Sequence, residues 1–252
     1  MTVPVYLPYY VLAGSIGIIA VYLAGLDRAL RNDRWASNKR AAVMWAGSII
    51  ILGWFALSVW LTLEGSYSAR PDRIPTIQYA IFVPVIVGGV MIGRSAFFAR
   101  IIDAIPQHWL VGVQLYRTLG AIFLVLFGTR ELPGLFAWPA GLGDVLVGVL
   151  PPVVAIAYFR DPQANGDLVA AWNWLGLGDL AVAVTAGFLT SPSAFQLFAF
   201  ELPNQLITEF PLALIPVFLV PVSVLFHLAS LKKLHSDTAR AKTESSSARA
   251  FA

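Results

Sequence analysis

The chain contains no cysteine, and this absence excludes several kinds of chemistry. Without thiols there is no disulfide framework, no CxxC redox pair, no thiolate metal site and no cysteine nucleophile. Histidine is also scarce, because only His108, His227 and His235 are present and they form no HExxH motif or other close pair. We therefore expect no zinc or haem site made of neighbouring imidazoles. The sequence does not identify a cofactor.

Charged residues are few as well. They make up 12% of the 252 residues, whereas 58% are hydrophobic, and the mean hydropathy is +0.74. This composition is typical of membrane proteins and excludes an ordinary soluble enzyme. The formal net charge is only +3 and comes from loops and the C-terminal tail, so no nucleic-acid partner is expected. The partners indicated are the lipid bilayer and a small solute or proton.

Long apolar runs dominate the rest of the sequence. Seven of them reach the roughly 20 residues that a helix needs to cross a bilayer. They cover residues 8–27, 42–63, 76–93, 107–128, 135–158, 168–190 and 209–231. Barrel strands would be about half this length and would alternate in polarity. The first run has no basic segment before it, so we interpret it as a span and not as a signal peptide. The sequence predicts an all-α, polytopic membrane protein with a seven-helix domain over residues 1–231.

The basic residues are distributed unequally between the two sides of this predicted bundle. Three lie in loops on one side, namely Arg70, Arg73 and Arg130. Thirteen lie on the other side, namely Arg28, Arg31, Arg34, Lys39, Arg40, Arg94, Arg100, Arg160, Lys232, Lys233, Arg240, Lys242 and Arg249. The positive-inside rule then predicts an external N-terminus and a cytoplasmic C-terminus. We expect a multi-pass protein of a plasma membrane, of the bacterial inner-membrane type.

Two segments outside the predicted spans have a character of their own. Residues 232–252 are polar, basic and rich in Ser and Ala, which predicts a disordered cytoplasmic tail that can lie on anionic lipid. Residues 191–210 form a long aromatic connector without Lys or Arg. Ser193 and Gln196 there fit a capping box, so a short interfacial helix is expected. This connector either rests on the membrane or acts as a lid over an external cavity.

A weak internal repeat appears when the chain is divided into one single helix followed by three helical hairpins. The second member of each hairpin contains a proline within an apolar run, at Pro84, Pro152 and Pro216. YRTLG at 116–120 also aligns with WNWLG at 172–176. Repeats of this kind are common in transporter folds.

The sequence GLGD occurs twice, at 141–144 and at 176–179, and places Asp144 and Asp179 inside predicted spans. Arg117 is the third charged residue within hydrocarbon. Charges at such depth are costly unless they face a partner or a water-filled cavity, so they indicate a functional site by default. Small residues repeat at helical spacing around each aspartate, which predicts close helix packing and turns both carboxylates into the bundle.

Depth along the spans brings these three residues to the same level. At 1.5 Å per residue, each lies near the middle of its span. We therefore predict that Arg117 is hydrogen-bonded to Asp144, Asp179 or both, because a guanidinium fork suits two carboxylates. Gln114 shares a helix face with Arg117, Thr118 and Ala121 in the fourth span. Asn173 shares a helix face with Asp179 in the sixth span. The alternative is that the cluster only sets helix register.

The last span carries a second polar stripe, which includes Glu209, Ser223 and His227. It would run from an external carboxylate to a cytoplasmic imidazole and could line a polar path through the bundle. The competing interpretation is structural: Glu209 favours a helix N-terminus, Pro216 kinks the helix, and His227 lies at the cytoplasmic interface.

GLGD within a membrane helix resembles the GxGD motif of intramembrane aspartyl proteases, the class of presenilin and the prepilin peptidases. The resemblance implies that Asp179 and Asp144 share a proton and activate water. It covers four residues at each site. Both aspartates here have the GxGD context, whereas the family has it on one. The family's Tyr-Asp dipeptide is absent, and PLAL at 211–214 differs from its Pro-Ala-Leu element. We assign no residue as catalytic.

The seven-span plan is also similar to that of microbial rhodopsins. The lysine that a retinal Schiff base requires is missing from the last span, where the first lysines are Lys232 and Lys233 at its cytoplasmic end. The leading hypothesis is a transporter or permease-like protein for protons, a cation or a small solute. The alternatives are an intramembrane enzyme that acts on a lipid or peptide, and a non-catalytic ligand-binding or accessory component.

Overall fold

The computed structural model describes residues 4–250, with side chains described up to Arg240. The described chain is all-helical, and seven of its helical segments are long and apolar enough to cross a membrane. These segments are Tyr6–Asn32, Ser37–Leu63, Ile77–Arg94, Gln107–Gly128, Gly134–Arg160, Gly166–Thr190 and Ile215–Arg240. Each overlaps one predicted span. The chain is a multi-pass membrane protein, and the predicted seven-helix class is confirmed.

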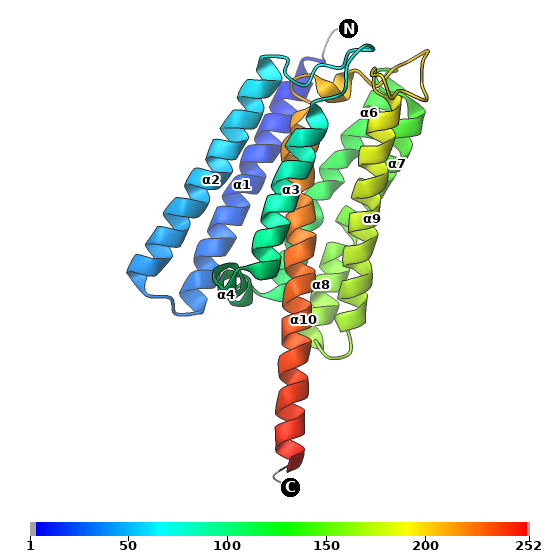
Figure 1. The fold of residues 1–252 in the computed structure, drawn as a ribbon. Helices are drawn as coiled ribbons and strands as arrows, with labels where there is room; N and C mark the ends of the chain where they lie inside the picture. Colours follow the sequence, from blue (N-terminus) through cyan, green and yellow to red (C-terminus); the bar gives the residue numbers. More distant parts are fainter. Residues whose placement is uncertain (1–3, 251–252) are drawn as a thin grey trace.

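Four of the spans are continuous α-helices and three are interrupted (Figure 1). The continuous ones are α1 (Tyr6–Asn32), α2 (Ser37–Leu63), α3 (Ile77–Arg94) and α9 (Gly166–Thr190). The fourth span consists of α5 (Gln107–Gly112), the 3₁₀ segment η1 (Val113–Ala121) and α6 (Ile122–Gly128). The fifth consists of α7 (Gly134–Val149) and α8 (Pro151–Arg160), and the seventh of the π-helical turn η3 (Ile215–Leu219) and α10 (Val220–Ala250). The short helix α4 (Ala96–Ala104) follows α3, and the 3₁₀ turn η2 (Leu206–Thr208) precedes η3.

The two ends of the bundle carry different connectors. The N-terminus, the α2–α3 and α6–α7 loops and residues 191–214 lie at one end, which we call the N-terminal face (Figure 1). The α1–α2 and α8–α9 loops, α4 and the C-terminal end of α10 lie at the other, the C-terminal face. The basic loops of the sequence are on the C-terminal face, which the positive-inside rule predicts to be cytoplasmic.

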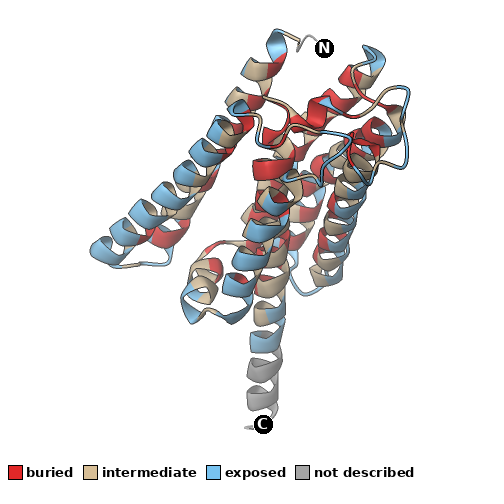
Figure 2. Ribbon diagram, turned by 45° about the horizontal axis from the view of Figure 1, so that its top comes forward, coloured by how far each residue is buried: buried red, intermediate tan, exposed pale blue. Residues whose placement is uncertain are grey.

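The core of the bundle lies around α7, which packs against both η1 and α9. α10 packs against α3, α9 and α5, and α1 packs against α2 and η1. By contrast, α2 and α3 are largely exposed along their length (Figure 2). Their exposed side chains are apolar, with Ile49 67%, Trp60 58% and Ile86 62% exposed. Such continuous apolar surface fits hydrocarbon and not water.

The predicted hairpin repeat is reflected only in part in the packing. The fourth and fifth spans pack together, and so do the sixth and seventh, as the repeat requires. α2, however, packs chiefly on α1 and not on α3, its expected hairpin partner. Apolar sequences align easily, and here the proline positions alone did not determine which helices pair.

A disordered tail was expected over residues 232–252. In the structure α10 instead continues as a helix to Ala250. Its first turns beyond residue 231 are tied to α4. Lys233 Nζ donates a hydrogen bond to the Asp103 carbonyl oxygen over 3.0 Å, and Arg240 pairs with the Asp103 carboxylate. These contacts are long-range in sequence, so the polar composition of the tail did not reveal them.

The expected interfacial helix in residues 191–210 is absent, because this connector consists of turns followed by η2. The Ser193 hydroxyl accepts from the Phe195 amide over 3.1 Å, so Ser193 forms a tight turn in place of a capping box with Gln196. The amides of Leu197 and Phe198 both bond back to the Leu189 carbonyl. The connector therefore folds back onto the end of α9.

Candidate functional site

Arg117 lies in η1, at the middle of the fourth span, and its side chain is only 2% exposed. A 3₁₀ helix has three residues per turn, so side chains three apart share one face. Gln114, Arg117 and Gly120 are accordingly the buried residues of η1. The α-helical stripe predicted from the sequence, with Thr118 and Ala121, is wrong beyond Arg117 because the local pitch is not α-helical.

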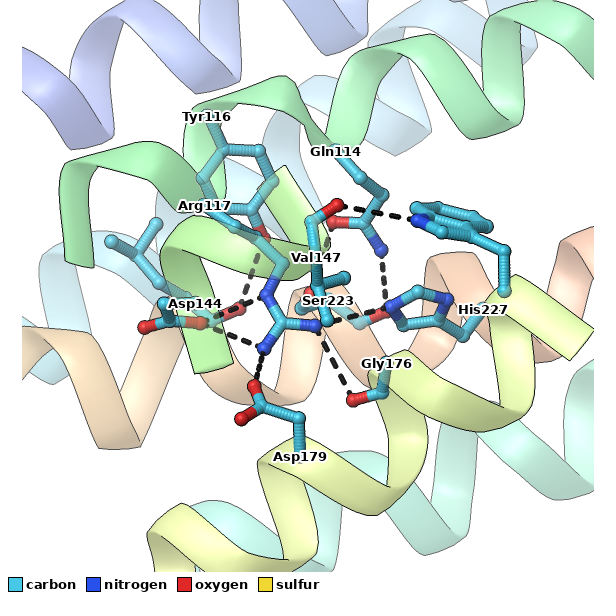
Figure 3. Close-up of polar contacts among 11 residues, drawn as sticks. Gln114, Tyr116, Arg117, Asp144, Val147, Gly176, Asp179, Ser223 and His227 are labelled. Atoms are coloured by element: carbon cyan, nitrogen blue, oxygen red, sulfur yellow. Dashed lines mark hydrogen bonds and ion pairs between the residues drawn. The ribbon is translucent and has the colours of Figure 1, made fainter. Parts of the chain in front are cut away.

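Arg117 binds both predicted aspartates (Figure 3). Its Nε and Nη2 donate to Asp144 Oδ1 over 2.9 and 2.7 Å, and Nη2 also donates to Asp179 Oδ2. The side chains of Asp144 and Asp179 are 16% and 10% exposed. The three residues thus meet near mid-depth, as the helix-face and depth arguments predict. One cation between two carboxylates leaves a net charge of −1 when both acids are ionised.

The remaining guanidinium nitrogen, Nη1, faces the opposite side of the cluster. It donates to the Gly176 carbonyl oxygen over 3.3 Å and lies 3.4 Å from His227 Nε2. Because a guanidinium can only donate, His227 Nε2 acts as the acceptor and the ring carries its proton on Nδ1. His227 Nδ1 then donates to Asn173 Oδ1 over 2.9 Å.

Buried polar contacts continue from Asn173 toward the C-terminal face. The Asn173 side-chain amide donates to Ser230 Oγ over 2.8 Å, and the Gln107 amide donates to the same oxygen over 2.6 Å. His227, Asn173 and Ser230 are fully buried, and Gln107 is 3% exposed. We call this set of hydrogen-bonded residues the His227 chain (Gln107, Asn173, His227 and Ser230). It lies between Arg117 and the C-terminal face.

The glycines of the two GLGD sequences have different surroundings, although the sequences are identical. A Cβ on Gly143 would overlap the Asp179 carboxylate, and one on Gly141 would touch Leu124. A Cβ on Gly176 would overlap the His227 ring, whereas one on Gly178 would meet nothing within 4 Å. Gly143 and Gly176 therefore permit close approach at the cluster, Gly141 permits close approach to α6, and Gly178 serves neither purpose.

The other predicted residues are placed less centrally. Gln114 and Ser223 form a reciprocal pair, in which Gln114 Nε2 donates to the Ser223 carbonyl oxygen over 3.1 Å and Ser223 Oγ donates to Gln114 Oε1 over 2.9 Å. Glu209 lies before the seventh span, in the connector that follows η2, and makes no hydrogen bond to the cluster among the described residues. The polar path through Glu209, Ser223 and His227 stays a prediction.

His227 is more central than predicted, because its Nε2 lies 3.4 Å from Nη1 of Arg117, at the middle of the fourth span. His227 therefore lies beside the cluster and not at the expected cytoplasmic interface. Two further neighbours of the cluster were not predicted from the sequence, namely the Gly176 carbonyl and the ring of Trp172, which lies 4.9 Å from the His227 ring. Trp172 Nε1 donates to the Val147 carbonyl oxygen over 3.2 Å and so ties α9 to α7.

Two adjoining cavities reach Asp144. The smaller, of about 40 Å³, is lined by Asp144, Arg117, Gly120 and Tyr116, among others. The larger, of about 270 Å³, extends from Asp144 to connectors at the N-terminal face, where Tyr67, Ser191 and Thr208 line it. Burial raises the pKa of Tyr67, so its phenol stays protonated near neutral pH.

The larger cavity also reaches the lipid-facing surface. Phe82 of α3 is 50% exposed and Thr185 of α9 is exposed, and both line the cavity. Its opening therefore lies between α3 and α9, within the half of the membrane nearer the N-terminal face. On the opposite side of Arg117 the His227 chain is buried, so the described access to the cluster is one-sided.

These features define a class: an all-helical, multi-pass membrane protein with an Arg/Asp/Asp cluster at mid-depth and a cavity that reaches one of the acids. Residues 74–235 match the family described as a domain of unknown function (DUF8737), and the chain belongs to this family. The match begins before α3 and contains every charged residue of the cluster. No curated protein and no solved structure matches the chain.

Proposed function

We propose that the protein is a transporter or permease-like membrane protein that carries a proton, a cation or a small solute by way of Asp144. In this proposal Asp144 binds the transported group and Asp179 holds Arg117 in place. Arg117 neutralises part of the negative charge. We also propose, from the charge of the loops, a plasma membrane of the bacterial inner-membrane type with the C-terminal face in the cytoplasm.

One observation carries this proposal, namely the unequal surroundings of the two sides of the cluster. On the side of the N-terminal face, Asp144 lines a cavity of about 270 Å³. On the other side, His227, Asn173 and Ser230 are 0% exposed. A binding group that is reached from one side and closed from the other is what one state of an alternating-access transporter requires.

The irregular helices near the cluster support the same function. η1 carries Arg117, the π-helical turn η3 contains Pro216, and the fifth span breaks between Val149 and Pro151. Interrupted helices at the midplane are characteristic of transporters, and 3₁₀ and π segments within longer helices often occur at functional hinges. Such segments can change their hydrogen bonding at lower cost than a regular helix.

The intramembrane enzyme remains a second candidate, and the cavity between α3 and α9 favours it because a lipid or peptide could enter there. The contacts of Arg117 argue against a protease-like pair. An aspartyl dyad works with two carboxylates that share one proton. Here Arg117 Nη2 donates to both Asp144 and Asp179, and a shared cation favours two ionised acids in place of a shared proton.

Flux into liposomes tests the proposed function. The purified protein would be reconstituted, and the movement of protons, sodium and potassium would be followed with pyranine and ion-sensitive dyes after a concentration step. We expect a flux above that of protein-free liposomes that is lost in Asp144→Asn and kept in Asp161→Asn. The control removes the same charge in the exposed α8–α9 loop. Equal fluxes in wild type and Asp144→Asn would refute the proposal, and no flux above protein-free liposomes would refute transport of protons, sodium and potassium.

A further inference from the structure

The free oxygen of Asp144 indicates what kind of head group the site takes. Oδ1 accepts both hydrogen bonds from Arg117, and Oδ2 accepts none among the described residues. Oδ2 lies against Gly120, where any larger residue would overlap it, and Gly120 and Asp144 both line the smaller cavity. An unfilled acceptor in a cluster with net negative charge calls for a cationic donor.

The size of the smaller cavity restricts that donor. A volume of about 40 Å³ admits a group of the size of water or a primary ammonium, which offers three N–H donors. A quaternary ammonium is larger and has no N–H to donate. Asp144 is the one anionic group among the described residues that line this cavity, so it is the acceptor that a cation would bind.

The larger cavity indicates the rest of the ligand. Its wall is mostly apolar and includes Phe123, Phe136, Leu180, Ala183 and Phe188. At about 270 Å³ it exceeds an apolar cavity of about 150 Å³ that is known to hold benzene. The two cavities share Asp144, Leu180, Ile215 and Val220 in their linings, so they adjoin at the carboxylate.

We infer that the ligand is a small amphiphilic amine, whose ammonium head binds Asp144 in the smaller cavity and whose apolar body, of one or two rings, fills the larger one. Such a molecule partitions into the membrane and enters between Phe82 and Thr185. This inference rests on the proposed function, because it names the substrate class of the same site. Binding, however, can be measured without transport.

Matched ligands test the inference with the full-length protein in lipid nanodiscs. The probes are 1-naphthylmethylamine, its neutral analogue 1-naphthylmethanol, and methylammonium, a cation without an apolar body. We expect the amine to bind tighter than the alcohol by about tenfold or more, which corresponds to about 1.4 kcal/mol. Methylammonium should show no saturable binding over the concentrations at which the amine saturates. Naphthalene fluorescence and calorimetry report both aromatic ligands.

Three variants locate the binding. Asp144→Asn should abolish the preference for the amine over the alcohol while the alcohol still binds. Ala183→Phe should reduce binding of both, because Ala183 lines the larger cavity. Ala171→Phe, on the exposed surface of the same helix and outside the lining of both cavities, should bind like wild type. Their folding is checked by size-exclusion chromatography and thermal unfolding.

The outcomes separate this inference from the proposed function. Equal affinity for amine and alcohol in wild type would overturn it, and so would a preference that survives Asp144→Asn. Unchanged binding in a folded Ala183→Phe would overturn it as well. A charge preference without an Asp144-dependent flux of ions or of 1-naphthylmethylamine into liposomes would support the ligand class and refute transport. A flux that depends on Asp144 without a charge preference would support transport and refute the ligand class.

Discussion

Arg117 directs two of its nitrogens, Nε and Nη2, at a single oxygen of Asp144, over 2.9 and 2.7 Å. The guanidinium group therefore does not bridge the two oxygens of the Asp144 carboxylate. Oδ2 has no hydrogen bond among the described residues. Asp179 receives its own bond from Nη2. The arginine is thus fully engaged, whereas Asp144, which lines two cavities, retains a carboxylate oxygen without a hydrogen bond among the described residues.

Replacing Arg117 tests whether the two acids depend on its charge. Arg117→Leu should lower the free energy of unfolding by about 3–5 kcal/mol, because it leaves two buried carboxylates without their cation. Adding Asp144→Asn and Asp179→Asn should recover part of this loss. Thermal unfolding in detergent measures both effects, with Arg70→Leu in the exposed α2–α3 loop as the control.

If Arg117→Leu alone does not fold, recovery of folded protein in the triple variant still supports the charge argument. Unchanged stability of Arg117→Leu would contradict it, and so would a triple variant less stable than the single one.

The two GLGD sequences offer a matched pair of glycines. Gly143→Ala should destabilise the protein by about 1–3 kcal/mol, because the added methyl group overlaps the Asp179 carboxylate. Gly178→Ala meets open space and should be neutral or stabilising by up to about 1 kcal/mol, since alanine is the better helix former. Unfolding midpoints of the two variants decide the matter. Effects of equal size and sign would show that the close approach at Gly143 is not a constraint.

Asn173→Leu tests the His227 chain. The substitution leaves the buried His227 Nδ1 proton without an acceptor, which should cost about 1–3 kcal/mol of stability. Thr238→Ala removes a hydrogen bond on the exposed end of α10 and should change stability little. The same unfolding assay compares them. Should Asn173→Leu prove as stable as Thr238→Ala, the chain does not help to close this side of the cluster.

The predicted orientation can be checked by labelling, because the chain has no cysteine of its own. Glu201→Cys lies on the N-terminal face and Gln163→Cys on the C-terminal face, and both positions are exposed. A membrane-impermeant maleimide applied to intact cells should modify Glu201→Cys and leave Gln163→Cys unmodified until the cells are opened. The reverse labelling pattern would show that the N-terminal face is cytoplasmic and would contradict the predicted orientation.

Much of this structure follows from local sequence properties. Apolar length predicts all seven spans, and small-residue stripes together with depth bring Arg117, Asp144 and Asp179 to one level. These predictions succeed because hydrocarbon demands a fixed helix length and penalises unpaired charge strongly. Both requirements act on each helix separately and so leave a clear pattern.

Features that depend on contacts between distant segments were not predictable in the same way. The 3₁₀ pitch of η1 buries Gly120, whereas the predicted α-helical stripe continued from Arg117 to Thr118. No local signal in the sequence marks this change of pitch. The position of His227 beside Arg117 and Asn173 depends on how α10 packs against α9 and α5. The cavity between α3 and α9 depends on how whole helices pack.

Access to Asp144 from the bilayer is the central claim, and carbodiimide labelling tests it most directly. The lipid-soluble dicyclohexylcarbodiimide modifies carboxyl groups that it can reach within a membrane, and mass spectrometry of the digested protein locates the adduct. We expect modification at Asp144 that increases as the pH is lowered and its carboxyl becomes protonated, and little at Asp179, which lines neither of the two cavities that reach Asp144. An Asp144 that stays unmodified at every pH at which the protein is folded would mean that the cluster is sealed and structural, and would contradict the proposed site.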